Sequence, residues 1–158
     1  MSSSLQRREE EARMMRKVRK DAKKVVARAK EQKWAIVLLD NQFGLSERSL
    51  ASREFTEAYV VYARAANTLY DHGYAGVSVK LTRYINNFNC AEPSAEFRFR
   101  GKLLATGVHF TVGGGNLLEK NPKPTGDEYI WHPVKRETPL AALIEFLEKR
   151  AKKLRLKK

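Results

Sequence analysis

The sequence predicts an α+β fold: a largely antiparallel sheet of about four to five strands with helices packed on one side, plus a long basic N-terminal helix and a basic C-terminal helix. Two observations lead to this class. Apolar residues recur at helical spacing near both ends of the chain and over residues 55–69, whereas apolar and polar residues alternate in several runs between residues 77 and 112. The 158 residues, 42% of them hydrophobic, suffice for one domain with a hydrophobic core.

The N-terminal helix is expected over residues 6–31. Acidic residues gather in its first turns and basic residues later, an order that is favourable with the helix dipole. Small apolar residues recur every three or four positions, and these are Ala12, Met15, Val18, Ala22, Val25 and Ala29. This stripe is shorter than the ~3–4 heptads of a coiled coil. Most of the helix is therefore expected to be exposed, and a homodimer formed through residues 12–29 stays open.

A strand and a second helix are expected next. Residues 36–39 (IVLL) are apolar on both faces, which predicts a central strand covered on both sides. The helix that follows carries an unbroken apolar stripe from Phe55 to Leu69. Gly73 is expected to end this helix in the C′ position, where the left-handed conformation favours glycine.

Two adjacent strands follow. Residues 77–85 and 95–100 alternate between apolar and polar side chains, with a loop between them. In the second strand Phe97 and Phe99 share one face, and this face is expected to point into the core.

The chain then turns at Gly101 into a strand over residues 103–112. The run Gly113-Gly114-Gly115-Asn116 is expected to end that strand. Residues 119–127 read as a polar loop that contains proline, and residues 129–132 as a last short strand.

The last helix is expected to begin at Thr138-Pro139, because threonine is a good N-cap and proline is favoured at the first helical position. Its apolar side chains line one face and are Leu140, Leu143, Ile144, Leu147, Ala151 and Leu154.

Net positive charge is confined to the two ends of the chain. Residues 1–35 carry a net charge of +7, residues 149–158 carry another +7, and the residues between them carry −1. We therefore expect a basic helical extension at residues 1–32, a compact α+β domain at residues 33–148 and a basic tail at residues 149–158 that continues the last helix. This distribution favours an anionic and extended partner, of which nucleic acid is the commonest.

Basic residues of both arms are the candidate phosphate contacts, because each neutralised phosphate releases a counterion. They are Arg13, Arg16, Lys17, Arg19, Lys20, Lys23, Lys24, Arg28, Lys149, Arg150, Lys152, Lys153, Arg155, Lys157 and Lys158. The alternative is a solvated helix whose C-terminal bases only favour the dipole of the last helix.

The sheet offers a second candidate surface. If the alternation holds, one face carries Lys80, Tyr84, Arg98, Arg100 and His109 opposite the core. Basic and aromatic side chains on an open sheet bind single-stranded nucleic acid by stacking and phosphate contacts. The alternative is an ordinary polar face on which Glu96 pairs with a base, and an exposed Trp131 would add a further stacking candidate.

No catalytic, cofactor or metal motif is found. His72, His109 and His132 are scattered without the spacing of metal ligands. Cys90 is expected to be a small filler, and Gly113-Gly114-Gly115 lacks the lysine and the helix of a phosphate-binding loop. A metal-dependent nuclease that uses His109 or His132 with Asp127 or Glu128 stays open.

These observations favour a non-enzymatic nucleic-acid-binding protein, with RNA slightly ahead of DNA. The alternative is an adaptor or assembly protein whose basic helix docks on an acidic protein partner or an anionic surface. A single cysteine, no export signal and no apolar run near the ~20 residues of a membrane span lead us to expect a cytoplasmic protein.

Overall fold

The computed structural model describes residues 5–6, 8–9, 13, 23–28, 31, 36–39, 52–85, 88, 91–123 and 126–156, with the backbone alone at 36–39, 52–56, 85 and 91. The strands are β1 (Ile36–Leu39), β2 (Val77–Ile85), β3 (Ala91–Phe99), β4 (Lys102–Phe110), β5 (Asn116–Lys120) and β6 (Tyr129–Pro133). The labelled helices are α2 (Ser52–Asp71) and α3 (Pro139–Leu156), and a 3-10 turn, η1, spans Val112–Gly114. Residues 23–28 are also helical.

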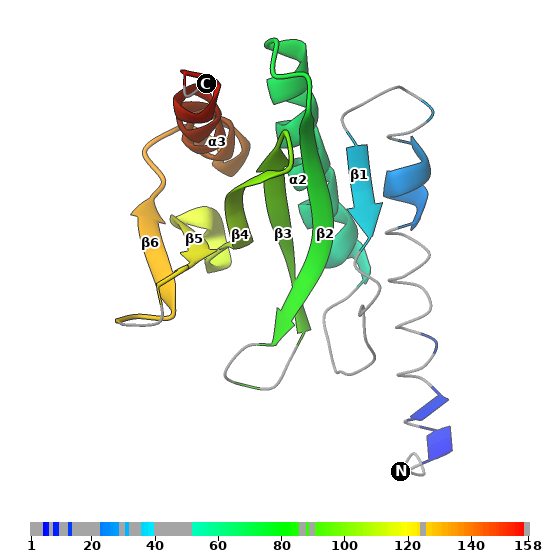
Figure 1. Ribbon diagram of the computed structural model, residues 1–158. Helices are drawn as coiled ribbons and strands as arrows, with labels where there is room; N and C mark the ends of the chain where they lie inside the picture. Colours follow the sequence, from blue (N-terminus) through cyan, green and yellow to red (C-terminus); the bar gives the residue numbers. More distant parts are fainter. Residues whose placement is uncertain are drawn as a thin grey trace.

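The predicted α+β class is confirmed. Strands β2 to β6 form an antiparallel sheet in chain order, and β1 joins it parallel to β2. Both labelled helices lie on one side of this sheet, α2 against β2 and β3 and α3 against β4 and β5 (Figure 1).

The core lies between the sheet and these two helices. Phe97 and Phe99 point into it as predicted, and Tyr62 and Tyr74 meet them edge to face, with ring centroids 6.4 and 5.7 Å apart. Leu147 of α3 is fully buried there. Burying each large apolar side chain contributes about 1.5–3 kcal/mol, so this layer accounts for much of the cohesion between helices and sheet.

Both helix boundaries that the sequence predicted are confirmed. At the end of α2 the amide of Tyr74 donates to the Leu69 carbonyl at 3.0 Å, and that of Gly73 donates to the Tyr70 carbonyl at 3.0 Å. This is a Schellman motif, and its C′ residue Gly73 has a φ of +97°. At the start of α3 the hydroxyl of Thr138 accepts from the Ala141 amide at 3.2 Å.

The prediction of a central strand at residues 36–39 is wrong. In the described part of the chain β1 pairs with β2 alone, so it lies at one edge of the sheet (Figure 1). An apolar run indicates that both faces are covered, but it does not count the neighbouring strands. The expectation of an exposed N-terminal helix holds for Lys23, Lys24 and Arg28, whereas Val25 is buried with the core residues.

The sequence also failed to predict β5. The glycine run ends β4 as expected, but it then turns the chain back into the sheet. Gly113 and Gly114 have φ values of +84° and +75°, and the amide of Asn116 donates to the hydroxyl of Thr111 at 3.0 Å. The predicted loop at residues 119–127 therefore begins two residues later, because Glu119 and Lys120 still belong to β5.

Candidate functional site

The sheet forks at one end. Strands β3 and β4 stay paired as far as Ala95 and Val108. Beyond this pair β3 continues alongside β2 to Ala91, while β4 continues alongside β5 to Phe110. Two register shifts in the β3–β4 ladder precede the fork. Pro93 lies in the part of β3 beyond the fork, and as a proline it has no backbone N–H to donate to a neighbouring strand.

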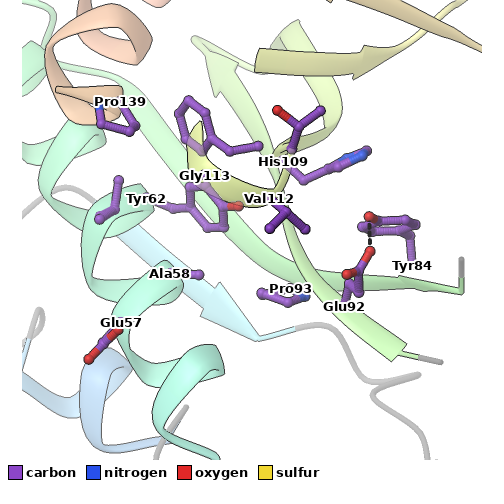
Figure 2. Close-up of a pocket in the computed structure, with 13 residues that line it drawn as sticks. Glu57, Ala58, Tyr62, Tyr84, Glu92, Pro93, His109, Val112, Gly113 and Pro139 are labelled. Carbon is purple, nitrogen blue, oxygen red and sulfur yellow. Dashed lines mark hydrogen bonds between the residues drawn. The ribbon is translucent and has the colours of Figure 1, made fainter. Parts of the chain in front are cut away.

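A cavity of about 600 Å³ lies at this fork, and we call it the fork cavity. One wall comes from Ala58 and Tyr62 of α2, and the opposite wall from Tyr84, Glu92 and His109 of three strands (Figure 2). Its mixed apolar and polar lining is typical of a ligand site.

The strand wall of the fork cavity is a connected polar group. The Tyr84 hydroxyl donates a hydrogen bond to the Glu92 carboxylate, which is drawn as a dashed line in Figure 2. The His109 ring stacks on Tyr84 with centroids 4.1 Å apart. His109 Nδ1 lies 2.8 Å from the Gly107 carbonyl. Because a carbonyl only accepts, Nδ1 carries the hydrogen and Nε2 is left as an acceptor.

The protonation states of this wall follow from its burial. Loss of solvent lowers the pKa of His109, against smaller opposing effects of Gly107 and Glu92. Burial, followed by the hydrogen bond and charge of Glu92, raises the pKa of Tyr84. At neutral pH the imidazole and the phenol are therefore both uncharged.

Tyr62 supplies an unpartnered polar group to the opposite wall. The residue is only 2% exposed, yet its hydroxyl forms no hydrogen bond with any described residue. Figure 2 shows this hydroxyl turned into the fork cavity. Burial and the nearby Glu92 raise the pKa of Tyr62, so the phenol is neutral. This hydroxyl is therefore available to a ligand or a water molecule in the cavity.

The second feature is the face of the sheet away from α2 and α3, which we call the open face. Inward-facing Val79 and Phe97 are directly paired, so the residues that alternate with them point to the other side. His109 is paired with Leu118 and Leu118 with Trp131, which places all three on that same side. The open face carries Lys80, Tyr84, Arg98, His109, Lys120, Tyr129 and Trp131.

Aromatic rings gather at the centre of the open face. The ring of Tyr129 meets His109 edge-on at 5.1 Å and lies 6.2 Å from Tyr84. Gly107 makes room for it, because a Cβ there would lie 3.5 Å from the Tyr129 ring and 3.0 Å from the Lys120 Cβ. Trp131, on the edge strand, is 59% exposed. The exposed Trp131 and the half-buried Tyr129 thus present aromatic rings on this face, and Lys120 is paired directly with Tyr129.

The structure brings together four of the five sheet residues expected on one face, namely Lys80, Tyr84, Arg98 and His109. Arg100 is the exception, because it occupies the β3–β4 turn with a φ of +53° and lies 4.9 Å over the Phe99 ring. The expected pairing of Glu96 is also present, since Arg98 Nε donates to its carboxylate at 3.1 Å.

Two of the C-terminal bases are built into the fold. Arg150 donates two hydrogen bonds of 2.6 Å to the buried carboxylate of Glu119, which also contacts His132 at 3.0 Å. Arg155 lies 4.1 Å over the Tyr74 ring and donates to its hydroxyl at 3.2 Å. These guanidinium groups tie α3 to the rest of the molecule.

Other bases of α3 face solvent. Lys149 lies 3.6 Å from Glu145, whereas Lys152 and Lys153 are exposed and form no ion pair with a described residue. Lys149 and Lys153 line a groove of about 360 Å³ together with Lys135 and Arg136, which precede α3.

The N-terminal candidates are described only in part. Arg13, Lys23, Lys24 and Arg28 are exposed. The remaining arm candidates lie outside the described residues, as does Cys90; they are Arg16, Lys17, Arg19, Lys20, Lys157 and Lys158.

The histidines hold separate positions. His72 Nδ1 lies 3.3 Å from the Glu148 carboxylate. His132 forms a separate pair with Glu119. Within the described ranges, no three residues of the metal-binding types lie close enough to hold an ion. No helix among those ranges is both long and apolar enough to cross a membrane.

Sequence reasoning missed Tyr62, Glu92 and Tyr129. Tyr62 was counted only as part of the apolar stripe of α2, and Glu92 was placed in a loop. The pairing of Tyr84 with Glu92 depends on the β2–β3 register, which alternation alone does not give. The alternation of side chains in β6 could have placed Tyr129 on the same face as Trp131.

No family model, curated protein or solved structure matches this chain. Its function must therefore be inferred from the geometry of the open face and the fork cavity.

Proposed function

We propose that this protein binds single-stranded nucleic acid, RNA in preference to DNA, and that it does so without catalysing a reaction on it. The observation that supports this most is the pair of aromatic residues, exposed Trp131 and half-buried Tyr129, on an open face that also carries lysines. Trp131 and Tyr129 offer rings on which bases stack. Lys120 is paired with Tyr129, Lys80 lies farther along the same face, and neither lysine forms an ion pair with a described residue. Open sheets of this kind bind single strands through stacking and phosphate contacts.

Single strands suit this surface better than duplexes. Bases inside a duplex are already stacked on one another, so their faces are not available to Tyr129 or Trp131. The exposed lysines of α3 and the basic N-terminal residues add phosphate contacts that do not depend on sequence. An acidic protein partner, the alternative, would use the same lysines but has no need of exposed rings.

The experiment that tests the proposal removes one ring. Trp131→Ala should weaken binding of a labelled single-stranded RNA by about 1–3 kcal/mol, which is roughly a 5- to 150-fold higher Kd. Fluorescence anisotropy measures the Kd, and Trp131→Phe should retain most of the affinity.

Tyr70→Ala is the matched control, because Tyr70 is an exposed aromatic residue, 45% accessible, on α2 rather than on the open face. It should bind as the parent does. Equal losses in both variants, or no loss in Trp131→Ala, would mean that the open face is not the binding surface.

A further inference from the structure

The fork cavity adjoins the open face, because two side chains belong to both. Tyr84 and His109 form part of the aromatic group on the open face and also line the cavity. A single strand of RNA bound across Tyr129 and His109 would therefore pass the mouth of the cavity. One of its bases can leave the stack and enter at that point.

The fork cavity is acidic although the chain as a whole is strongly basic. The charged residues among its described lining are Glu57 and Glu92, while the chain carries a net charge of +13. The tyrosines and His109 are neutral there. Such an interior repels phosphate and favours a group that donates hydrogen bonds.

Most polar groups of the cavity are hydrogen-bond acceptors that lack a full set of donors. Glu92 receives one hydrogen bond from Tyr84, although a carboxylate offers about four lone-pair sites. His109 Nε2 is an acceptor, because Nδ1 donates to Gly107. The Tyr62 hydroxyl faces the cavity and has no hydrogen-bond partner among the described residues. An occupant that supplies adjacent N–H groups would satisfy these atoms.

Among the four RNA bases, guanine fits this pattern best. Its Watson–Crick edge presents an imino N–H beside an amino group, two neighbouring donors that a carboxylate accepts together. Adenine and cytosine place an acceptor nitrogen beside their single amino group, and uracil places its N–H between two carbonyls. A carboxylate would face an acceptor in each of these three cases, which is unfavourable.

We propose that the fork cavity is a guanine-binding site, in which Glu92 accepts from the Watson–Crick edge of one extruded base while Tyr62 and Tyr84 line the walls. This inference rests on the proposed single-strand binding and adds a base preference to it. Glu92 is then a specificity-determining residue, and the open face supplies the affinity that all sequences share.

The test compares three short RNAs of equal length: an oligouridylate, the same strand with one central guanosine, and the same strand with one central adenosine. Binding is measured by fluorescence anisotropy on the full chain. The guanosine-containing strand should bind about tenfold more tightly than the other two. Glu92→Gln should abolish this preference and leave oligouridylate binding unchanged, since glutamine still accepts from Tyr84 but presents an amide.

Glu96→Gln is the matched control, because Glu96 lies in the same strand and is bonded to Arg98 and Thr106 outside the cavity. It should keep the guanosine preference. Tyr62→Phe, which removes only the unpartnered hydroxyl, should reduce the preference, and thermal melting checks that both cavity variants are folded.

Each other outcome has a defined meaning. Equal binding of the three RNAs would overturn the guanine site and leave single-strand binding intact. Equal binding of the three RNAs, together with tetramethylammonium binding that Glu92→Gln abolishes, would also overturn it and would assign the acidic cavity to an organic cation. No binding of any RNA at low salt would overturn the proposed function itself.

Discussion

His109 is the residue at which the open face and the fork cavity meet. It stacks on Tyr84, meets Tyr129 edge-on and donates from Nδ1 to Gly107. Together these contacts fix the orientation of the ring. The ring is 5% exposed, so protonation would bury a charge beside two phenol rings.

This placement makes stability depend on pH. Burial lowers the pKa of His109 below its ordinary value of 6.5, so the unfolded chain takes up the proton at higher pH than the folded protein does. The stabilising contribution of neutral His109 is present above the unfolded pKa and is lost as the pH falls through the folded pKa. Urea denaturation between about pH 7 and 5 should show a smaller loss of stability in His109→Phe than in the parent.

His72→Gln provides the comparison, because His72 is an exposed histidine paired with Glu148. A parent-like pH dependence in His109→Phe would show that another group causes the loss.

Arg150 is expected to contribute to the fold rather than to phosphate binding. Its partner Glu119 has a side chain only 3% exposed, whereas Arg150 itself is 35% exposed. Arg150→Met should strand a buried carboxylate and lower the free energy of unfolding by roughly 3 kcal/mol, the lower end of the range for broken buried pairs. Urea denaturation measures this change.

The double variant Glu119→Leu with Arg150→Met tests whether the loss of stability comes from the unpaired buried carboxylate or from the absence of the ion pair itself. It should recover most of the stability, because an apolar pair of similar volume replaces the ion pair. A double variant as unstable as Arg150→Met alone would argue against this account of Glu119.

At the scale of the element, α3 combines two functions on two faces. Its inner face holds Leu143, Leu147 and Ala151 in the core, and its outer face presents Lys152 and Lys153 to solvent. The basic C-terminal residues therefore divide into those that hold the helix against the fold and those that are exposed to solvent.

This division predicts opposite effects of similar substitutions. Lys153→Gln should reduce the slope of log affinity against log salt by about one and leave stability unchanged, because it removes one phosphate contact. Arg155→Gln should instead lower the melting temperature, because Arg155 lies over Tyr74 at the end of α2. Salt titrations and thermal melts of both variants check this, and the reverse pattern would contradict the assignment.

Helices α2 and α3 were predictable from sequence, whereas the position of β1 in the sheet and the existence of β5 were not, for physical reasons. The signals at the ends of α2 and α3, Gly73 and Thr138, act within a few residues, so local chemistry specifies them. The edge position of β1 and the pairing of β5 depend on partners far along the chain. The fork cavity is equally non-local, because it arises where β3 and β4 separate beyond the Ala95–Val108 pair.

At the scale of the whole molecule, the charge arrangement and the fold are linked. The sequence predicts basic arms at residues 1–32 and 149–158, and within them Val25 and Ala151 are both buried among the core residues. Removing residues 149–158 would therefore remove core and ion-pair contacts along with charge. The contribution of the arms is better measured by substituting exposed lysines than by truncation.

The measurement that tests the central claim most directly compares single-stranded RNA with the duplex of the same sequence across a salt series. We predict tighter binding of the single strand at every salt concentration, with negative slopes for both ligands and a remaining single-strand advantage at high salt from stacking on the open face. Equal affinities that fall together with salt would contradict the stacking surface and leave only phosphate attraction. Affinities that do not change with salt would contradict phosphate binding as well.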